Sequence, residues 1–204
     1  MISTVVLSTI ISLSSCNSNQ DNNTQSSATE QAAPEHNHEG HDHSAHQQQA
    51  TSQAQSIEEL AQKAPSEFIP AFKFYKVKSG ISFTNVDIPT DKKTVFILFD
   101  PSCGHCQVEA SHLSQNYDKL KDVNLYFISM NDPALMANFL ETFGKNLVGK
   151  PNVEVLYDRN QDFIQKIHIP SQFPANYVYS KDGKIQSYWE GDKDITDIIA
   201  EYTK

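Results

Sequence analysis

Hydrophobic and polar residues alternate in blocks over residues 66–204, and the blocks predict a series of strands and helices. A continuous apolar run of strand length lies at 94–99, as expected for a strand buried on both faces. Two further strands are predicted at 123–128 and 153–157. Asp132-Pro133 should open a helix and Gly144 should end it. Apolar residues at the helical spacing of three and four follow the first two of these strands: Cys106, Ala110, Leu113, Tyr117 and Leu120 after the first, and Leu135, Met136, Phe139, Leu140 and Phe143 after the second.

Two hairpins and two further helices complete the predicted pattern. The segments 72–77 and 81–86, and later 175–179 and 184–189, are joined by glycine-containing turns, which predicts two antiparallel hairpins. Strands that alternate with helices and end in a hairpin predict an α/β fold whose mixed central sheet is flanked by helices. A short helix is expected at about 160–167, and a closing helix carries Ile195, Ile198, Ile199 and Tyr202.

Residues 5–13 form a short apolar run near the start of the chain. The run is shorter than the roughly 20 residues that span a bilayer, but it fits the core of an export signal peptide. Leu13-Ser14-Ser15-Cys16 follows it and resembles a bacterial lipobox. We therefore expect 1–16 to be a lipoprotein signal peptide that ends at a lipidated Cys16. No Lys or Arg precedes the run, which leaves the true start of the chain open, and the alternative is a free N-terminus with a chance cysteine.

Residues 17–56 are polar or charged, with Ala as their only aliphatic residue. Such a segment cannot bury enough apolar surface to offset the entropy of ordering it. We therefore expect a disordered tether with an r.m.s. reach of roughly 35 Å. A folded domain over 57–204 should follow the tether.

Histidines are crowded into one part of this tether, with Glu39 and Asp42 between them. His-rich tracts bind divalent metals such as Zn, Cu or Ni. A flexible tract has no fixed ligand geometry, so we expect weak and unselective binding. The alternative is low-complexity sequence without a ligand. The candidate metal ligands are His36, His38, His41, His43 and His46.

Composition and cysteine count exclude several functions. The chain is acidic, with a net charge of −9, and no stretch combines Lys or Arg with interleaved aromatic residues, so nucleic acid is not an expected partner. Of the three cysteines only Cys103 and Cys106 form a close pair, which leaves no framework of structural disulfides. The pair could also be half of a zinc site, but the sequence offers no second pair to complete four ligands.

Cys103-Gly104-His105-Cys106 is the most informative motif in the chain. It follows the buried strand at 94–99, and Asp100-Pro101-Ser102 separates that strand from the helix that begins at the pair. At a helix N-terminus, backbone N–H groups and the helix dipole favour the thiolate form of Cys103. Cys106 lies one turn later, in the buried stripe. One accessible thiolate and one shielded thiol are what disulfide exchange requires.

Residues 66–204 resemble the thioredoxin superfamily, and within it the extracytoplasmic TlpA-like and AhpC/TSA-like branch. The resemblance rests first on the unit of strand, Cys-X-X-Cys and helix. Glu109, three residues after Cys106, and Phe173-Pro174, directly before a strand, also match the branch. The predicted helical insertion at 132–150 fits it as well.

This resemblance implies a thioredoxin-like fold and a redox-active disulfide that needs no bound cofactor. Cys103 would attack a substrate disulfide, Cys106 would resolve the mixed disulfide, and Pro174 would be cis and lie beside the pair. Glu109 would tune a thiol pKa or relay a proton, with an ordinary exposed helix acid as the alternative. Pro170 is the competing cis residue, and we prefer Pro174 because a strand starts directly after it.

Several positions depart from the family pattern. Ser102 stands where a Trp usually precedes the first cysteine, Phe173 where Thr, Val or Ile usually precedes the cis-proline, and Ile97 where small thioredoxins carry a buried Asp. Gly104-His105 is the dipeptide of protein disulfide isomerases and is not typical of reductases. His105 can stabilise the neighbouring thiolate, which favours the reduced form and makes the couple more oxidising. The direction of electron flow therefore stays open.

Two functional classes follow from these features. The first is an envelope thiol–disulfide oxidoreductase, lipid-anchored and facing the periplasm, that acts on protein disulfides or dithiols and exchanges electrons with a membrane thiol carrier. The second is a metal-handling lipoprotein that binds Cu or Zn through the histidine tract and the thiols. A peroxidase is less expected, because Asp100 stands where a peroxidatic cysteine has a Thr three residues earlier. His112 and His168 have no clear partner in the sequence and are expected to be structural or surface residues.

Overall fold

The computed structural model describes residues 64–204 of the chain. The predicted signal peptide, the lipidated Cys16, the tether at 17–56 and its histidine tract lie outside the described residues. The start of the folded domain at residue 57 lies outside them too. Among the residues that are described, no helix is long and apolar enough to cross a membrane.

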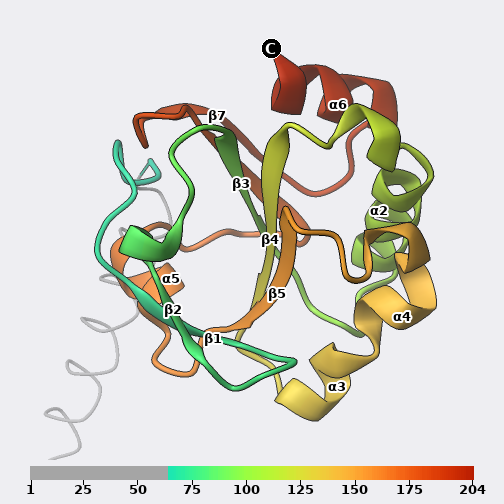
Figure 1. The fold of residues 1–204 in the computed structure, drawn as a ribbon, viewed down its shortest axis with the longest axis horizontal. Helices are drawn as coiled ribbons and strands as arrows, with labels where there is room; N and C mark the ends of the chain where they lie inside the picture. The colour runs from blue at the N-terminus through green and yellow to red at the C-terminus, as the bar shows by residue number, and fades with distance from the viewer. Residues whose placement is uncertain (1–63) are drawn as a thin grey trace, which may run out of the picture. The chain divides into compact units, whose positions relative to one another are not determined.

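In residues 64–204, seven strands form one mixed sheet in the order β2-β1-β5-β4-β3-β6-β7. The strands predicted at 94–99, 123–128 and 153–157 pair in parallel as β3, β4 and β5, and the other neighbouring strands are antiparallel. The predicted mixed sheet and both hairpins are therefore confirmed (Figure 1). The strands are β1 (Lys73–Lys76), β2 (Ser82–Thr84), β3 (Lys93–Leu98), β4 (Val123–Ser129), β5 (Val153–Tyr157), β6 (Ala175–Tyr179) and β7 (Ile185–Glu190).

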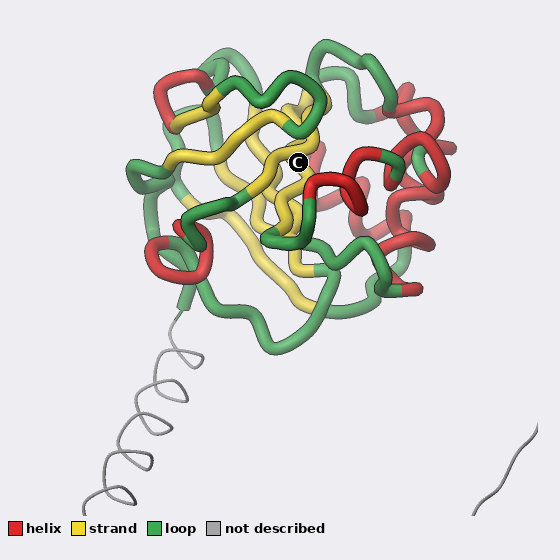
Figure 2. Tube along the Cα trace, turned by 90° about the horizontal axis from the view of Figure 1, so that it is seen from below, coloured by secondary structure: helices red, strands yellow, loops and turns green. Residues whose placement is uncertain are grey.

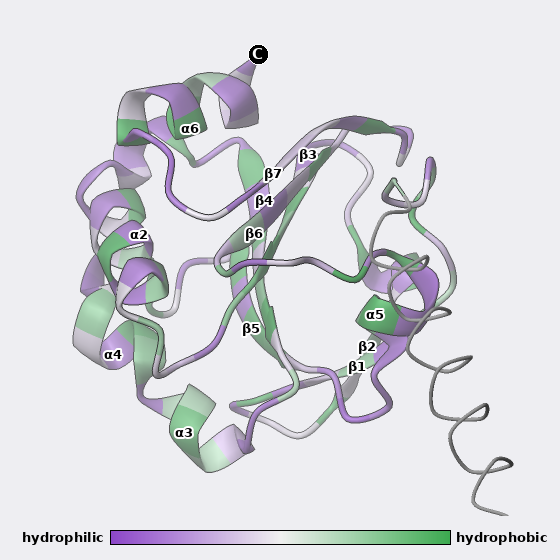
Figure 3. Ribbon diagram, turned by 180° about the vertical axis from the view of Figure 1, so that it is seen from behind, coloured by the Kyte–Doolittle hydropathy of each residue, from purple (hydrophilic) through white to green (hydrophobic). Residues whose placement is uncertain are grey.

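Helices lie on both sides of the sheet, as Figures 1 and 2 show. α2, α4 and α6 cover one face and α5 covers the other (Figure 3). Short 3₁₀ turns occur at Asn85–Asp87, Tyr117–Lys119 and Lys145–Leu147. The α-helices of the described region are α2 (Gly104–Gln115), α3 (Pro133–Ala137), α4 (Phe139–Phe143), α5 (Asp162–Lys166) and α6 (Ile195–Thr203).

The alternation of side chains along β3 divides the core into two clusters. Ile97 faces the cluster beneath α2, α4 and α6, whereas Phe96 and Leu98 face the cluster with Phe163 of α5. Successive residues of a strand point to opposite faces, so a strand buried on both faces must be apolar throughout. The uninterrupted run at 94–99 accordingly lies inside the sheet, between β4 and β6. The reactive motif follows directly after this buried strand.

The structure corrects two predicted helices and one strand. The apolar residues from Cys106 to Leu120 were predicted on one helix. In the structure this helix ends at Gln115, and a separate 3₁₀ turn follows it. The helix predicted from Asp132 to Gly144 is broken at Asn138 into α3 and α4. Leu135, predicted on its apolar face, is 63% exposed, whereas Met136 beside it in α3 is fully buried.

The second predicted strand is shorter than the apolar pattern indicated, and a 3₁₀ turn replaces its end. The Asp87 carboxylate accepts hydrogen bonds from the backbone N–H and the hydroxyl of Thr84, at 2.8 and 2.7 Å. These bonds cap the turn. Val86, predicted in the strand, is consequently 83% exposed.

Candidate active site

The turn between β3 and α2 is held by one carboxylate. Asp100 Oδ1 accepts hydrogen bonds from the backbone N–H of Ser102 at 2.7 Å and from its hydroxyl at 2.6 Å. Burial by itself would raise the pKa of the Asp100 carboxyl, but the hydrogen bonds from Ser102 and Asn131 outweigh burial and lower that pKa. Ser102, which departs from the family pattern, thus has a local role in fixing the turn before the cysteines.

Cys103 is the N-cap residue of α2, with extended backbone geometry. Its N–H donates to the Asp100 carbonyl at 3.1 Å, so the turn and the helix start share this residue. The side chain is partly exposed, and its Sγ lies 3.8 Å from the carbonyl oxygen of Phe173. The sequence-predicted nucleophile is therefore accessible and sits at a helix N-terminus, as a reactive thiol requires.

Cys106 lies one turn further along α2 and is only 3% exposed. Burial is the main reason why the pKa of the Cys106 thiol is raised well above its usual range, and the nearby Cys103 and Glu109 side chains raise it further. A thiol in this environment stays protonated near neutral pH. Any reaction in which Cys106 acts as a nucleophile must therefore include removal of its proton.

Glu109 belongs to the buried face of α2, three residues after Cys106, and is 6% exposed. Its carboxylate oxygens both accept hydrogen bonds from the side-chain amide of Asn176, each at 3.1 Å. Burial raises the pKa of Glu109 to about 7, the Asn176 amide opposes that rise, and the charge of Asp192 adds to it. A carboxyl group that titrates near pH 7 can both take and return a proton at neutral pH.

His105 points away from the core, as the sequence predicted, and its side chain is 66% exposed. Its Nδ1 lies 2.6 Å from Oδ2 of Asp192, in the segment between β7 and α6. Both groups are largely solvated, so the pair contributes little to stability. It connects the cysteine motif to a segment that is distant in the sequence.

The cis peptide bond of the described region is Phe173–Pro174, so the cis residue is Pro174 and not Pro170. Ala175, the next residue, begins β6 and pairs with Leu98 of β3. This register brings the loop before β6 to the end of β3, beside the start of α2. The site residues predicted in the described region are therefore gathered around the start of α2 and the beginning of β6: Cys103, His105, Cys106, Glu109 and Pro174.

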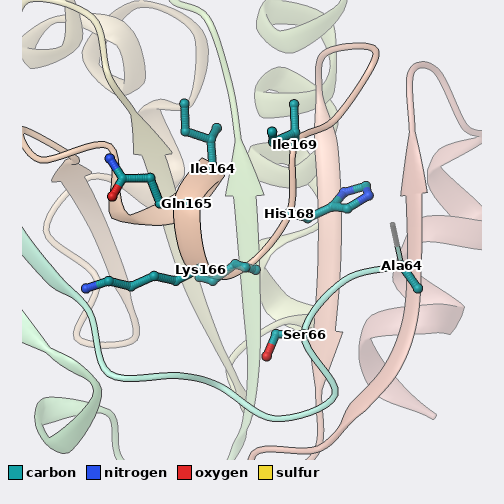
Figure 4. Close-up of a pocket in the computed structure, with 8 residues that line it drawn as sticks. Ala64, Ser66, Ile164, Gln165, Lys166, His168 and Ile169 are labelled. Carbon is teal, nitrogen blue, oxygen red and sulfur yellow. The ribbon is translucent and has the colours of Figure 1, made fainter. Parts of the chain in front are cut away.

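The two remaining histidines of the described region lie elsewhere. His112 is in the last turn of α2. His168 is buried, and its Nδ1 lies 2.9 Å from the hydroxyl of Tyr177 and 3.6 Å from Oε1 of Glu190. It also lines a cavity of about 130 Å³ that includes Ala64 and Ser66 (Figure 4). No residue of the cysteine motif lines that cavity, which agrees with a structural role for His168.

Metal ligands are not gathered in the part of the chain that the structure describes. No three residues among its His, Cys, Asp and Glu lie close enough to hold a metal ion. Within this region, Cys103 and Cys106 thus have no third ligand to form a zinc or copper centre.

Three side chains at the site were not predicted as functional. Asn176 is a fully buried amide inside the otherwise apolar strand β6, and its position two residues after Pro174 was the available signal. Tyr202 was predicted only as part of the apolar face of the closing helix, and its hydroxyl donates to Oδ1 of Asn176. Asp192 lies in a polar turn, where nothing in the sequence distinguishes it.

Comparison with solved structures supports the fold. A secreted Mycobacterium tuberculosis disulfide oxidoreductase homologous to E. coli DsbE is 21% identical, with a TM-score of 0.53, and the match covers 64% of this chain and 93% of that chain. The thioredoxin domain of a Bacteroides vulgatus thiol–disulfide oxidoreductase is 18% identical, with a TM-score of 0.53 and coverage of 70% and 99%. Arabidopsis thaliana ScoI with copper bound is 14% identical, with a TM-score of 0.52 and coverage of 68% and 96%. At these identities the likeness shows a thioredoxin-like fold.

Sequence comparison identifies the family. No curated protein matches the sequence. The model of the AhpC/TSA family matches residues 65–188, which is more than half of the chain. The matched span covers most of the described residues, over which the chain has the thioredoxin-like fold of the structures above. On this evidence the chain belongs to the AhpC/TSA family.

Proposed function

We propose that this protein exchanges disulfides with protein substrates in the bacterial cell envelope through the Cys103–Cys106 couple. The observation that carries the proposal is the contrast between the two thiols. Cys103 is partly exposed at the N-terminus of α2, 3.8 Å from the carbonyl of Phe173, whereas Cys106 is buried one turn later. The exposed thiol can attack a substrate disulfide, and the buried thiol can then resolve the mixed disulfide that forms.

The reaction proceeds in two exchanges. The Cys103 thiolate attacks one sulfur of the substrate disulfide, a Cys103–substrate disulfide forms, and the other substrate sulfur leaves as a thiolate that takes up a proton. Cys106 then loses its proton and attacks Cys103 Sγ. The second substrate thiol is released, and two electrons have passed from the cysteine pair to the substrate. Substrate oxidation is the same sequence in reverse.

Glu109 is the residue of the site that is suited to accept the Cys106 proton. It lies on the same buried face of α2, and its charge influences the Cys106 thiol. Because the pKa of Glu109 is about 7, the carboxylate is available as a base at neutral pH and can return the proton in the reverse reaction. We assign it the role of general base for resolution.

The direction of electron flow depends on the reduction potential of the couple. A donor such as a membrane thiol carrier would have to re-reduce the pair in a reductase, and an acceptor would have to re-oxidise it in an oxidase. A potential near about −270 mV is thioredoxin-like, and one near about −180 mV is typical of a disulfide isomerase.

The function is tested by equilibrating the protein in glutathione and dithiothreitol buffers of known potential, alkylating free thiols and measuring peptide masses. We expect Cys103 and Cys106 to oxidise together, in one two-electron step, to an intramolecular disulfide. The midpoint then assigns the direction. Cysteines that oxidise independently, or that form only intermolecular disulfides, would contradict an exchange couple.

The envelope location and the lipid anchor belong to the same proposal. They are supported by the apolar run and Leu13-Ser14-Ser15-Cys16, a lipobox-like sequence. We expect Cys16 to be diacylated and to retain the protein on a membrane. Mass spectrometry of the native N-terminus checks this, and a Cys16→Ser protein that stays equally membrane-bound would contradict it.

A second candidate function is metal handling, favoured by the five histidines between His36 and His46. We expect the full chain to bind Zn²⁺ and Cu²⁺ weakly, and the affinity to fall as the pH drops through about 6.5, because only neutral imidazole binds metal. Calorimetry compares the wild-type chain with a variant in which all five histidines are replaced by Asn. Equal affinities would remove the arm from any metal function.

A further inference from the structure

The carboxylate of Glu109 lies at one end of a buried chain of side-chain hydrogen bonds. Asn176 Nδ2 donates to both of its oxygens, at 3.1 Å each, and the hydroxyl of Tyr202 donates to Asn176 Oδ1. Asn176 and Tyr202 are both fully buried. Three elements, α2, β6 and α6, thus each contribute one polar group to an otherwise apolar cluster.

The order of hydrogen-bond donors in this network fixes the orientation of the Asn176 side-chain amide. A side-chain amide has one donor end and one acceptor end. Because the Tyr202 hydroxyl occupies the acceptor end, the donor end must face Glu109. A flipped amide would place its oxygen against the carboxylate and leave the buried Tyr202 hydroxyl without an acceptor, which is costly in a low-dielectric environment.

Asn176 is also well placed in the sheet to connect this hydrogen-bond network with the cysteine motif. It lies two residues after Pro174 and pairs with Ile97 on β3 and Trp189 on β7. Ile97 and Trp189 belong to the same apolar cluster or pack against it, so the amide is held in the middle of the sheet beneath α2. A rigid position of this kind is what a precise contact with a reacting group needs.

We propose that Asn176 and Tyr202 are positioning residues that hold Glu109 as an oriented carboxylate, ready to take the proton of Cys106 when the mixed disulfide is resolved. This inference rests on the proposed function. In the step concerned, the S–H bond of Cys106 breaks and its proton passes to a Glu109 oxygen. A Cys106–Cys103 disulfide forms, the bond from Cys103 to the substrate breaks, and the substrate sulfur leaves with the electron pair.

Other groups around Glu109 act against its ionisation. Asp192, from the segment between β7 and α6, adds a negative charge and raises the pKa of the Glu109 carboxyl, as burial does. On α2 the neighbouring titratable group is Cys106. Tyr202 stays protonated, because its burial raises the pKa of the hydroxyl far above neutral pH. Among these neighbours the Asn176 amide is the one that favours the charged form, so the carboxylate depends on it.

The aromatic disulfide dithiobis(nitrobenzoate) separates the two exchanges, because attack by Cys103 releases one coloured thiolate and resolution by Cys106 releases the second. In Asn176→Leu and Tyr202→Phe we expect the first release to be unchanged. In Asn176→Leu the second should slow by about fivefold at pH 7, with its pH midpoint moved upward by about one pH unit, because the hydrogen bonds to the Glu109 carboxylate are lost. Tyr202→Phe should move both quantities in the same direction, because the amide loses the hydroxyl that orients it. Titration of ¹³C-labelled Glu109 by NMR should show the same upward shift without reference to activity.

Tyr177→Phe is the matched control, because it removes the hydroxyl of another buried tyrosine that faces the opposite side of β6 and pairs with His168. It should leave the second release and the Glu109 titration unchanged. Tyr202→Phe keeps the ring, so it carries the test if Asn176→Leu does not fold. Unchanged midpoints in Tyr202→Phe would overturn the inference, as would a Glu109→Gln variant that resolves at the wild-type rate. If the wild-type protein did not release the first coloured thiolate, the proposed function itself would be wrong.

Discussion

A Glu109→Gln variant is expected to become more stable relative to the wild-type protein as the pH rises from about 4.5 to about 8. Over this range, the free energy of unfolding of the variant should rise by about 3 kcal/mol relative to that of the wild type. The reason is that Glu109 is 6% exposed and that its pKa rises from 4.5 to about 7 on folding, mainly through burial. Gln has no charge to bury.

The sign follows from which state holds the proton more tightly. Since the folded protein has the higher pKa, the stability associated with protonated Glu109 is fully present below pH 4.5 and is lost as the pH rises through about 7. Above about pH 8 the difference between the two proteins should be constant. Other titrating groups are common to both proteins and cancel in the difference.

Urea denaturation of both proteins with reduced thiols, at several pH values, measures this difference. Glu141→Gln is the matched control, because Glu141 is an exposed acid on α4, and its difference from the wild type should not vary over this range. A Glu109→Gln difference that is equally flat would show that Glu109 is ionised at no cost in the folded protein. Its assignment as a base with a pKa near 7 would then be wrong.

The sheet and the reactive motif could be predicted because their signals are local. The apolar run at 94–99, the break at Asp100-Pro101-Ser102 and the cysteine spacing all lie within residues 94–106. Each reports a different physical requirement: burial on both faces, a turn, and a helix start. These requirements agree with one another, and consistency of this kind makes a sequence pattern dependable.

The break in the predicted helix after β4 could not be seen in the same way. The apolar spacing of Met136, Phe139 and Leu140 continues across Asn138 as if the helix were unbroken. Hydrophobic periodicity reports which side chains face the core, and it does not report whether each backbone N–H reaches the carbonyl four residues earlier. Two short helices that face the same core therefore leave the pattern of one long helix.

The partners of Glu109 were beyond prediction for a different reason. Asn176 is 67 residues from Glu109, and Tyr202 is a further 26 residues along the chain. Only the register of β6 against β3 and the docking of α6 bring the three groups together. The position of Glu109 on the buried face of its helix was predictable from spacing, but its hydrogen-bond partners depend on tertiary structure.

A Cys106→Ser variant is expected to accumulate mixed disulfides between Cys103 and its substrates. Attack requires an accessible thiolate at the start of α2, and this environment does not depend on the Cys106 sulfur. Release requires a second thiol within reach, and in the described region Cys106 is the one beside Cys103. The variant should therefore complete the first exchange and stop, so that nearly all of its turnover is lost while its covalent adducts persist.

The most direct test is to alkylate free thiols in cells that express Cys106→Ser, Cys103→Ser or the variant with both substitutions, and to separate envelope proteins without reductant. We expect adducts with Cys106→Ser alone, their disappearance after treatment with dithiothreitol, and no turnover in Cys103→Ser. Mass spectrometry of the adducts would then identify the substrates. A Cys106→Ser protein that traps nothing, together with a Cys103→Ser protein that keeps full disulfide-reductase activity, would contradict the roles assigned to the two cysteines.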